Sequence, residues 1–535
     1  MNILAWDEKY TIAIKELIEL VKNSAAKTPD EINKLKYLVA KKYGLNRIPS
    51  NVEIVKFLRD MKESTDLIKY FVLKPVRSIS GVVIVAIMTA PYECPHGRCL
   101  YCPHYPNVPI SYTGKEPSAM RALQNELDPY KQVIARLKQL EAMGHVTDKV
   151  EVVIQGGTFN TTPLEYREWY MKRLLQAFIG YLPGSFEEGA RAAENAKRRI
   201  VGVTFETRPD ACSEEQIDWM LERGGTRVEL GVQTIYDDVY DYVNRGHTTY
   251  DVIEATRRLK DAGFKVTYHL MPGLPLVSIK HDIEVFNKVF SNPHYLPDSL
   301  KIYPTLVLEY TGLIKLYRDG LYTPIKDDDA VSLISSIKWN FIPKWVRIMR
   351  INRDISTKEI IDGVKKSNLR EIVQREMKRV GFKCRCIRCR EVGHKYLKGE
   401  HTAKDVTLTL TTYHASDGLE IFIAAEDPET DTIFGFIRVR RPSQKAWRPE
   451  ITCKETFIVR ELHVYGKAIP LAHTSDEISV WQHKGIGSLL LKKAEEIVSS
   501  YGGEKVVVIS GIGVRQYYYM HGYSRDGPYC SKLLI

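Results

Sequence analysis

The sequence predicts an α/β protein built around a partial barrel of six βα units, followed by a smaller α+β domain. Three observations predict this class. Between about residues 80 and 310, short β-rich apolar runs alternate with longer amphipathic segments, which is typical of a parallel sheet. Beyond about residue 405 the pattern becomes that of an antiparallel sheet with one long helix. The chain has 535 residues, so two or three domains are expected.

Residues 1–75 predict a basic helical domain. Apolar residues such as Ile14, Leu17 and Val21 recur at helical spacing without a strand pattern, and a lysine-rich stretch follows them. Ser50 precedes a further apolar segment and suits the cap of a helix start. We expect this region to hold a polyanion.

The barrel is predicted over residues 76–340. Its six strands are expected at residues 81–90, 150–157, 200–207, 227–233, 265–272 and 299–307. Polar or special residues stand where these strands end, namely Gly156, Gly157, Glu206, Arg208 and Gln233, with His269 and Pro272 near the end of the fifth. Barrels of this kind keep their chemistry at the carboxyl ends of the strands. A basic linker is predicted over 341–400, and the α+β domain over 401–535.

Composition limits the environment and partners of the chain. The net charge is +11, from 77 Lys and Arg against 66 Asp and Glu, which favours a polyanionic partner, although a solvated basic surface explains the charge equally well. The longest apolar run, Gly81–Ala90, is too short for a membrane helix, and the N-terminus lacks a signal-peptide pattern. Six of the nine cysteines are clustered, which favours metal binding over disulfides. We therefore expect a cytoplasmic protein with no membrane partner.

The loop after the first barrel strand reads CPHGRCLYCPH and places Cys94, Cys99 and Cys102 together. A structural zinc site is one reading, with His96 or His104 as the fourth ligand. A 2Fe-2S cluster completed by a distant cysteine such as Cys212 is another.

The position of this loop on a βα barrel favours a third reading. Three cysteines leave one iron of a 4Fe-4S cluster open, and S-adenosylmethionine (SAM) can occupy it as a source of a 5'-deoxyadenosyl radical. Gly156 and Gly157 would let the backbone approach the amino group of SAM. Glu206 and Arg208 would meet its ribose and carboxylate groups.

In the C-terminal domain, the segment QHKGIG (482–487) follows a strand and opens a helix. Its glycines permit a turn whose amide groups point at a pyrophosphate, aided by the helix dipole. Tyr517 or Tyr518, on a later helix, could protonate a departing CoA thiolate; each ring also suits a packed aromatic.

A third group, Cys384, Cys386 and Cys389, lies in the linker sequence CRCIRC. Zinc in a structural role is the predicted ion. His394 is the nearest candidate for a fourth ligand, which the sequence leaves undecided.

Taken together, these segments resemble the Elongator catalytic subunit family from about residue 70 to the C-terminus. The resemblance rests on the cysteine loop and on SYTGKEPSAMRA, GGTF, ETRPD, ELGVQ, NRGHT, KIYPTLV, VRELHVYG and GIGVRQYY. It implies a radical SAM barrel joined to a GNAT domain. The implied reaction transfers a carboxymethyl group, derived from acetyl-CoA, to C5 of the wobble uridine in tRNA.

The resemblance also implies roles for individual residues. Cys94, Cys99 and Cys102 match the cluster ligands, and Lys149 matches a lysine tied to acetyl-CoA use. The implied acetyl-CoA contacts, together with the predicted turn, are Glu461, Leu462, His463, Val464, Gln482, Lys484, Gly485, Ile486, Gly487, Ser488, Leu489 and Tyr518. The implied partners are the tRNA anticodon loop and an external electron donor, and a homodimer stays open. A shorter cysteine loop than in eukaryotic members, and a CxCxxC set absent from some of them, indicate a prokaryotic-type member that acts without other Elongator subunits.

Two other functions compete with this interpretation. A protein lysine acetyltransferase would use the GNAT domain directly, with Glu461 as the general base. A tRNA-binding scaffold with a redox cluster would use neither cleft for catalysis. The transfer reaction requires the barrel and the GNAT domain to meet, so we predict a closely packed interface between them.

Overall fold

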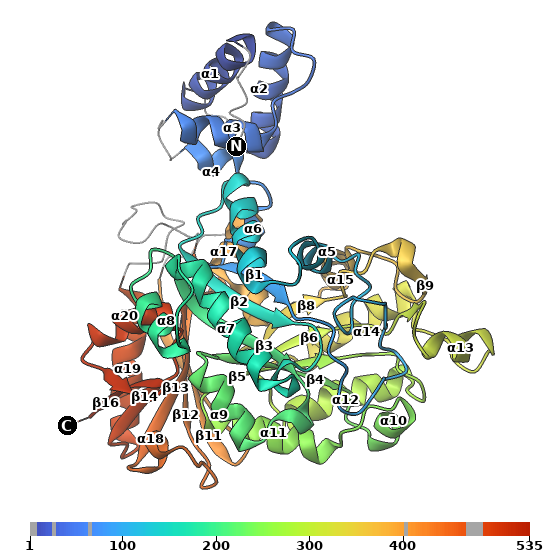
Figure 1. Ribbon diagram of the computed structural model, residues 1–535, viewed down its shortest axis with the longest axis vertical. Helices are drawn as coiled ribbons and strands as arrows, with labels where there is room; N and C mark the ends of the chain where they lie inside the picture. Colours follow the sequence, from blue (N-terminus) through green and yellow to red (C-terminus); the bar gives the residue numbers. More distant parts are fainter. Residues whose placement is uncertain (1–7, 24–27, 62–66, 401–404, 467–484, 535) are drawn as a thin grey trace. The chain divides into compact units, whose positions relative to one another are not determined.

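The computed structural model describes residues 8–23, 28–61, 67–400, 405–466 and 485–534 (Figure 1). The chain divides into two compact units. One comprises residues 1–78 with 135–147, and the other residues 79–134 with 148–535. Within the described ranges, no helix has the length and apolar character needed to cross a membrane.

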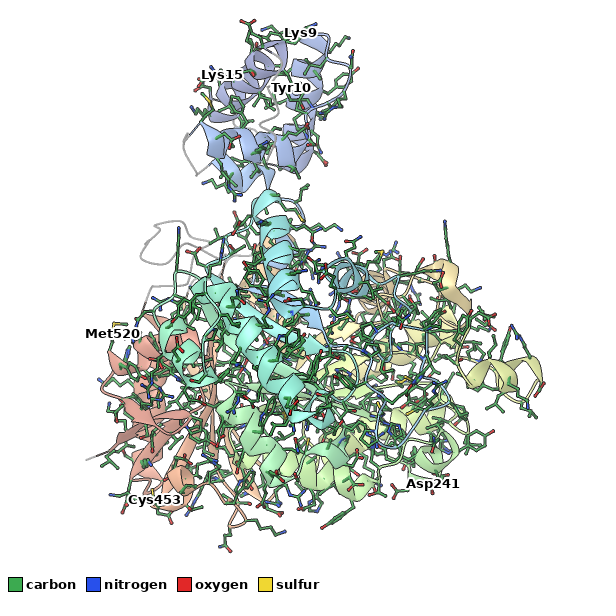
Figure 2. All side chains as sticks on the ribbon, viewed as in Figure 1. Lys9, Tyr10, Lys15, Asp241, Cys453 and Met520 are labelled. Atoms are coloured by element: carbon green, nitrogen blue, oxygen red, sulfur yellow. The ribbon has the colours of Figure 1, made fainter. Side chains whose placement is uncertain are left out.

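The first unit is helical, as predicted. Its helices are α1 (Glu8–Asn23), α2 (Pro29–Lys42), α3 (Asn51–Asp60) and α4 (Ile68–Phe71), joined by most of α6 (Pro129–Ala142). α1 packs on α2, and its apolar face shares one core with α3, with Ile14, Leu17 and Phe57 among the buried residues. Ser50 caps α3 through a capping box with Glu53. Lys9 and Lys15 extend from α1 at the surface (Figure 2).

The second unit begins with a parallel sheet in the order β1-β2-β3-β4-β5-β6-β8. The strands are β1 (Val83–Met88), β2 (Lys149–Gln155), β3 (Arg199–Thr207), β4 (Arg227–Gln233), β5 (Lys265–Leu270), β6 (Ser299–Ile302) and β8 (Arg347–Ile351). The six predicted strands are confirmed. The seventh, RIMRI, was assigned to the basic linker because its two arginines obscure a strand pattern.

Helices cover the outer face of this sheet (Figure 1). The helices of this part of the chain are α5 (Pro117–Gln124), α6, α7 (Leu164–Ile179), α8 (Phe186–Ala193), α9 (Glu214–Glu222), α10 (Asp237–Tyr242), α11 (Thr249–Asp261), α12 (Ile279–Ser291), α13 (Leu313–Arg318) and α14 (Asp327–Asn340), with short 3-10 turns at Phe159–Thr161 and Pro209–Ala211, and one at Pro75–Arg77 in the first unit. On the inner face, Lys301 of β6 reaches Glu206 of β3 although two strands separate them. The sheet is therefore curled into a partial barrel.

The linker continues directly from β8. It contains a 3-10 turn (Thr357–Glu359), β9 (Ile360–Asp362), α15 (Leu369–Arg379), α16 (Ile387–Arg390) and α17 (Val392–Leu397). β9 pairs antiparallel with β7 (Val307–Leu308), the strand that follows β6. This pairing ties the linker to the barrel.

The C-terminal domain has a second sheet in the order β10-β11-β12-β13-β14-β16-β15. Its elements are β10 (Thr407–Ala415), β11 (Gly418–Asp427), β12 (Thr432–Arg441), α18 (Pro449–Thr452), β13 (Thr456–Val464), α19 (Ile486–Ser500), β14 (Lys505–Val508), a 3-10 turn (Ile512–Val514), α20 (Arg515–Tyr519), β15 (Ser524–Asp526) and β16 (Tyr529–Leu533). All neighbours pair antiparallel except β13 and β14. The last hairpin, β15–β16, was not predicted.

A buried network of charges joins this domain to the barrel. Arg440 of β12 donates to Asp261 at 2.7 and 3.0 Å and to Glu420 at 2.9 Å. Arg460 of β13 binds Asp298, which immediately precedes β6, at 2.6 and 2.8 Å. The predicted close interface is confirmed. Because Asp261 and Asp298 precede β5 and β6, the C-terminal domain packs against the amino ends of the barrel strands.

Candidate functional site

A cavity opens at the carboxyl ends of the barrel strands. Cys94, Cys99 and Cys102 line it, together with Gly157, Glu206, Arg208, Glu229, Gln233, Arg245 and His269. The sulfur of Cys102 lies 3.3 Å from the Ser111 hydroxyl, and that of Cys94 lies 3.7 Å from the Thr158 hydroxyl. The three thiols thus face one space above the sheet, where the sequence analysis expected chemistry.

The distances between these sulfurs help to distinguish the three predicted metal centres, namely zinc, a 2Fe-2S cluster and a 4Fe-4S cluster. A single zinc ion holds sulfurs about 3.8 Å apart, given bonds of about 2.3 Å. Among the described residues, Cys94, Cys99 and Cys102 form no group with ligand atoms within 4.8 Å of one another. Cys212 is 1% exposed and donates to the Arg208 carbonyl, outside the residues that line the cavity. A cluster larger than one ion, without Cys212, fits this donor set best.

Gly156 and Gly157 follow β2 beside the cysteines. Their φ angles are 115° and 98°, a region that side-chain-bearing residues rarely adopt. A Cβ at Gly156 would lie 2.7 Å from the Thr89 hydroxyl. Only glycine lets this backbone pass so close to its neighbour.

Glu206, Arg208 and Gln233 all line the cavity, but the first two already have partners. Glu206 accepts hydrogen bonds from Gln155 at 2.8 Å and Lys301 at 3.3 Å. Arg208 holds Asp210 with two bonds of 2.8 and 2.9 Å. Their roles toward SAM remain predictions, and ribose or carboxylate groups would have to share these contacts.

Several cavity residues were not assigned roles from the sequence. Arg245, in NRGHT, is buried and donates toward the Cys99 sulfur at 3.6 Å. Glu229 and Lys301 are charged residues inside otherwise apolar strands and pair with each other. An ionisable residue within an apolar strand was the signal that could have found them.

A second candidate site lies in the C-terminal domain, where β13 and β14 diverge. They pair only from Thr456 to Val459 of β13, so the rest of that strand leaves β14. Residues 461–464, the implied acetyl-CoA contacts, all lie on the diverging part and are partly exposed. A strand edge of this kind can pair with an extended ligand.

The predicted pyrophosphate turn lies beside this opening. Gly485 is the N-cap of α19, with φ of 80°, and Ile486, Gly487, Ser488 and Leu489 form its first turn. A Cβ at Gly487 would lie 2.8 Å from the Tyr517 hydroxyl, so Tyr517 faces the turn. Tyr518 is 6% exposed and packs on Tyr523. Gln482 and Lys484 lie outside the described residues.

Models of three known protein families match parts of the chain. A family model of the Radical SAM superfamily matches residues 91–289, one of the Radical_SAM C-terminal domain matches 297–379, and one of the ELP3 N-terminal domain matches 10–79. The chain is 48% identical over 498 residues to the tRNA uridine(34) acetyltransferase of Methanocaldococcus jannaschii, covering 91% of this chain and 90% of that protein. It is 42% identical over 530 residues to Elongator complex protein 3 of Schizosaccharomyces pombe, covering 96% of each.

The chain belongs to the Elongator complex protein 3 family. Among solved structures, it resembles the archaeal Elp3 of Methanocaldococcus infernus with an N-terminal deletion, at a TM-score of 0.76 and 44% identity. That match covers 85% of this chain and 100% of the other. Membership of the radical SAM superfamily implies a 4Fe-4S cluster and SAM, and the three wide-spaced thiols and close glycine backbone fit them.

In this family member, Glu461 and Lys149 lie at the amino end of the barrel. Glu461 accepts from Arg438 at 3.0 Å and lies 4.0 Å from Arg227 of β4. Burial alone would raise the pKa of Glu461, but Lys265, Arg438 and Arg227 lower it to about 2. Lys149 is the first residue of β2, and burial lowers its pKa. Along β2, Lys149 is about 20 Å from Gln155, which lines the cavity, at about 3.3 Å per residue.

The linker of this family member holds the other thiol group. The sulfurs of Cys384, Cys386 and Cys389 do lie within 4.8 Å of one another, as one metal ion requires. His394 is not a member of that group; its Nε2 is 3.9 Å from Glu391. Cys453 is exposed on the C-terminal domain (Figure 2).

Proposed function

We propose that this protein modifies the wobble uridine of tRNA, transferring a carboxymethyl group derived from acetyl-CoA to C5 by radical SAM chemistry. One observation carries the proposal: a thiol-lined cavity and a diverging-strand cleft stand at opposite ends of the same barrel within one compact unit. The tRNA uridine(34) acetyltransferases of two Methanocaldococcus species, each 48% identical to this chain, support the choice of substrate.

At the carboxyl end, Cys94, Cys99 and Cys102 would hold the 4Fe-4S cluster, and the Gly156–Gly157 backbone would lie against SAM. When bound, the cluster and SAM supply an adenosyl radical that removes hydrogen from carbon. The protein's part is to orient the reactants and exclude water. Arg245 and Arg208, both buried beside the cysteine loop, add positive charge close to the thiolates.

At the amino end, the free edge of β13 and the first turn of α19 would hold acetyl-CoA. The helix dipole and the amide groups after Gly485 favour the pyrophosphate. The Tyr517 hydroxyl stands against Gly487, so it is better placed than Tyr518 to reach a ligand in this turn.

The acetyl end of the CoA thioester and the radical source would have to meet along the interior of the barrel. Barrel interiors of this type are usually filled with branched apolar side chains. Here Glu151 of β2 pairs with Arg227 of β4, which faces Glu461, while Lys265 of β5 lies in the same charge cluster. A polar interior suits the passage of a small polar group better than an apolar one would.

The basic character of the chain suits tRNA. Residues 1–78 contain fifteen Lys and Arg against ten Asp and Glu, and positive charge of this kind attracts the phosphate backbone. Zinc at Cys384, Cys386 and Cys389 is proposed as a structural ion.

The competing lysine acetyltransferase gains little support. It requires Glu461 as a general base, yet that carboxylate is held by Arg438 and has a pKa near 2. A base this weak takes a proton from a lysine ammonium poorly.

The decisive experiment supplies reconstituted protein, under anaerobic conditions, with tRNA, SAM, dithionite and acetyl-CoA labelled in the methyl group. Mass spectrometry of the digested tRNA is expected to show labelled 5-carboxymethyluridine. Cys99→Ala should abolish the label and the exposed-site control Cys453→Ala should keep it. Label in protein lysines with none in tRNA would favour the acetyltransferase instead.

A further inference from the structure

Five consecutive barrel strands each place one polar side chain on the inner face near the cavity. They are Gln155, Glu206, Glu229, His269 and Lys301, from β2, β3, β4, β5 and β6. Ligand atoms of Glu206, Glu229 and His269 lie within 4.8 Å of one another, a spacing that a metal ion could bridge. The Lys301 ammonium contacts both carboxylates. The Lys301 ammonium thus lies where a metal cation would otherwise bridge the two carboxylates.

Glu229 differs from the other members of this layer. Its side chain is 1% exposed, and it lines the cavity four residues before the end of β4. The Oε2 atom accepts from His269 Nε2 at 2.9 Å and from Lys301. The Oε1 atom is buried and accepts a hydrogen bond from none of the described residues. A buried carboxylate oxygen without a donor is costly, so this atom needs a donor from a ligand.

The groups around Glu229 keep it anionic. Burial alone would raise the pKa of Glu229, but Lys301 and His269 hold it well below its usual range. Lys301 faces it from β6 and His269 from β5, while Glu206 of β3 shares the same ammonium. The Glu229 carboxyl group is therefore ionised at neutral pH, so its Oε1 atom can accept a hydrogen bond but cannot donate one.

We propose that Glu229 recognises the uracil base, its Oε1 accepting the N3–H of the wobble uridine; this inference rests on the proposed function. Uracil carries one ring donor, N3–H, between two carbonyl groups. Cytosine has an unprotonated N3 there, which a carboxylate repels. Enzymes that act on a single base read its Watson–Crick edge in this way. A site that lacks its expected hydrogen bond rejects the wrong ligand strongly, because a buried polar group is left unpaired.

The depth of Glu229 favours the base over the cofactor. Of the residues expected to meet SAM, Gly156, Gly157 and Gln233 stand at the strand ends, whereas Glu206 lies level with Glu229 on the neighbouring strand and already shares Lys301 with it. Gln233 also has a buried acceptor, Oε1, without a donor among the described residues, but it stands at the very end of β4. Glu229 lies roughly 13 Å further along the strand toward the acetyl-CoA end, at about 3.3 Å per residue. A base reaching Glu229 would lie between the two cofactor positions.

The test compares wild-type protein with Glu229→Gln, using anticodon stem-loops that carry uridine, cytidine or 3-methyluridine at position 34. Glutamine has nearly the same shape but can turn its amide to donate to cytosine. Dissociation constants and product formation are measured, along with SAM affinity and 5'-deoxyadenosine formation without RNA. Glu116→Gln is the matched control, because that cavity carboxylate already accepts from the Thr113 amide at 3.0 and 3.1 Å.

We expect Glu229→Gln to lower kcat/KM with uridine-34 RNA by roughly 10- to 100-fold, the range of one hydrogen bond to a charged group. The preference for uridine over cytidine should collapse in Glu229→Gln and persist in Glu116→Gln. The 3-methyluridine RNA tests the same contact without changing the protein: wild type should bind it at least 10-fold more weakly. Iron content and circular dichroism verify that each variant is folded and loaded.

Two outcomes would overturn this assignment, and a third would overturn the proposed function. Unchanged discrimination in a folded Glu229→Gln protein overturns it. Loss of SAM affinity in that variant also overturns it, because Glu229 would then be a cofactor contact. If wild-type protein modifies no uridine-34 RNA at all, the proposed function itself fails, and that failure is visible before any variant is made.

Discussion

At the scale of single residues, several of the predicted site side chains already form hydrogen bonds or ion pairs with neighbouring residues. Glu206 and Arg208 stand where strand-end residues were expected, but each is held by neighbours. Glu461, an expected acetyl-CoA contact, is held in ion pairs. Glu229, by contrast, lies inside a strand and keeps one buried carboxylate oxygen without a donor among the described residues.

Gly156→Ala should destabilise the protein by about 1–3 kcal/mol and weaken SAM binding, because the new Cβ meets Thr89 at a strained φ. Thermal unfolding and SAM titration measure both effects. Gly180→Ala is the control: its φ is also positive, at 90°, but nothing lies within 4 Å of the new carbon. Equal losses in the two variants would show that the close approach at Gly156 is unimportant.

The pH dependence of stability should change in Glu461→Gln. The pKa of this carboxyl is about 2 in the folded protein and 4.5 as an ordinary value. A lowered folded pKa stabilises the protein above pH 4.5, and that contribution is lost as the pH falls toward 2. Urea unfolding between pH 5 and pH 2 should therefore show a wild-type advantage that shrinks by up to about 3 kcal/mol. A constant difference would contradict the ion pairing of Glu461.

At the scale of elements, loops and strand ends gather the ligands. The loop after β1 carries one thiol group and the segment around α16 carries the other, and only the second has its three sulfurs within 4.8 Å of one another. Gly485 before α19 and the diverging end of β13 form the proposed acetyl-CoA site only because β14 leaves β13 after Val459.

Cys386→Ser should remove one zinc per chain, measured by elemental analysis of protein purified without chelators. Three thiols within 4.8 Å hold one ion well, and two do so poorly. Since α16 packs on β8 through the bond from the Ile387 amide to the Val346 carbonyl, the thermal midpoint should fall as well. The exposed Cys453→Ser should leave the zinc content unchanged. Unaltered zinc in Cys386→Ser would place the ion elsewhere.

At the scale of the whole molecule, the barrel and the C-terminal domain share one charged interior. Arg440 and Arg460 bind Asp261 and Asp298 at the amino ends of the barrel strands, and Glu420 accepts from both arginines. Removing one partner from such a network leaves a buried charge uncompensated. The interface is therefore expected to hold the two domains in one fixed arrangement.

Arg440→Met should cost about 3–5 kcal/mol of unfolding free energy, because Asp261 and Glu420 lose a partner in the interior. The neighbouring Arg441→Met should cost no more than about 1 kcal/mol, since Arg441 pairs with Glu455 at the surface. Calorimetry of both variants checks the difference. Independent melting of the two domains in the wild-type protein would contradict the fixed arrangement.

The sequence by itself determined the local features. Apolar runs and their spacing predicted six barrel strands, the capped helix at Ser50 and an antiparallel C-terminal sheet with one long helix, because period and propensity are encoded in neighbouring residues. Clustered cysteines and glycine turns likewise predicted where ligands would lie along the chain.

Only the tertiary structure decided which of these residues meet. Lys301 and Glu206 are 95 positions apart and touch across the barrel, and the wide spacing of one thiol group against the narrow spacing of the other depends on loop geometry. Strand RIMRI joined the barrel through pairing with β6 despite its charges. The C-terminal domain, with the proposed acetyl-CoA site, lies at the amino ends of the barrel strands because of long-range ion pairs between domains, which no local pattern of residues encodes.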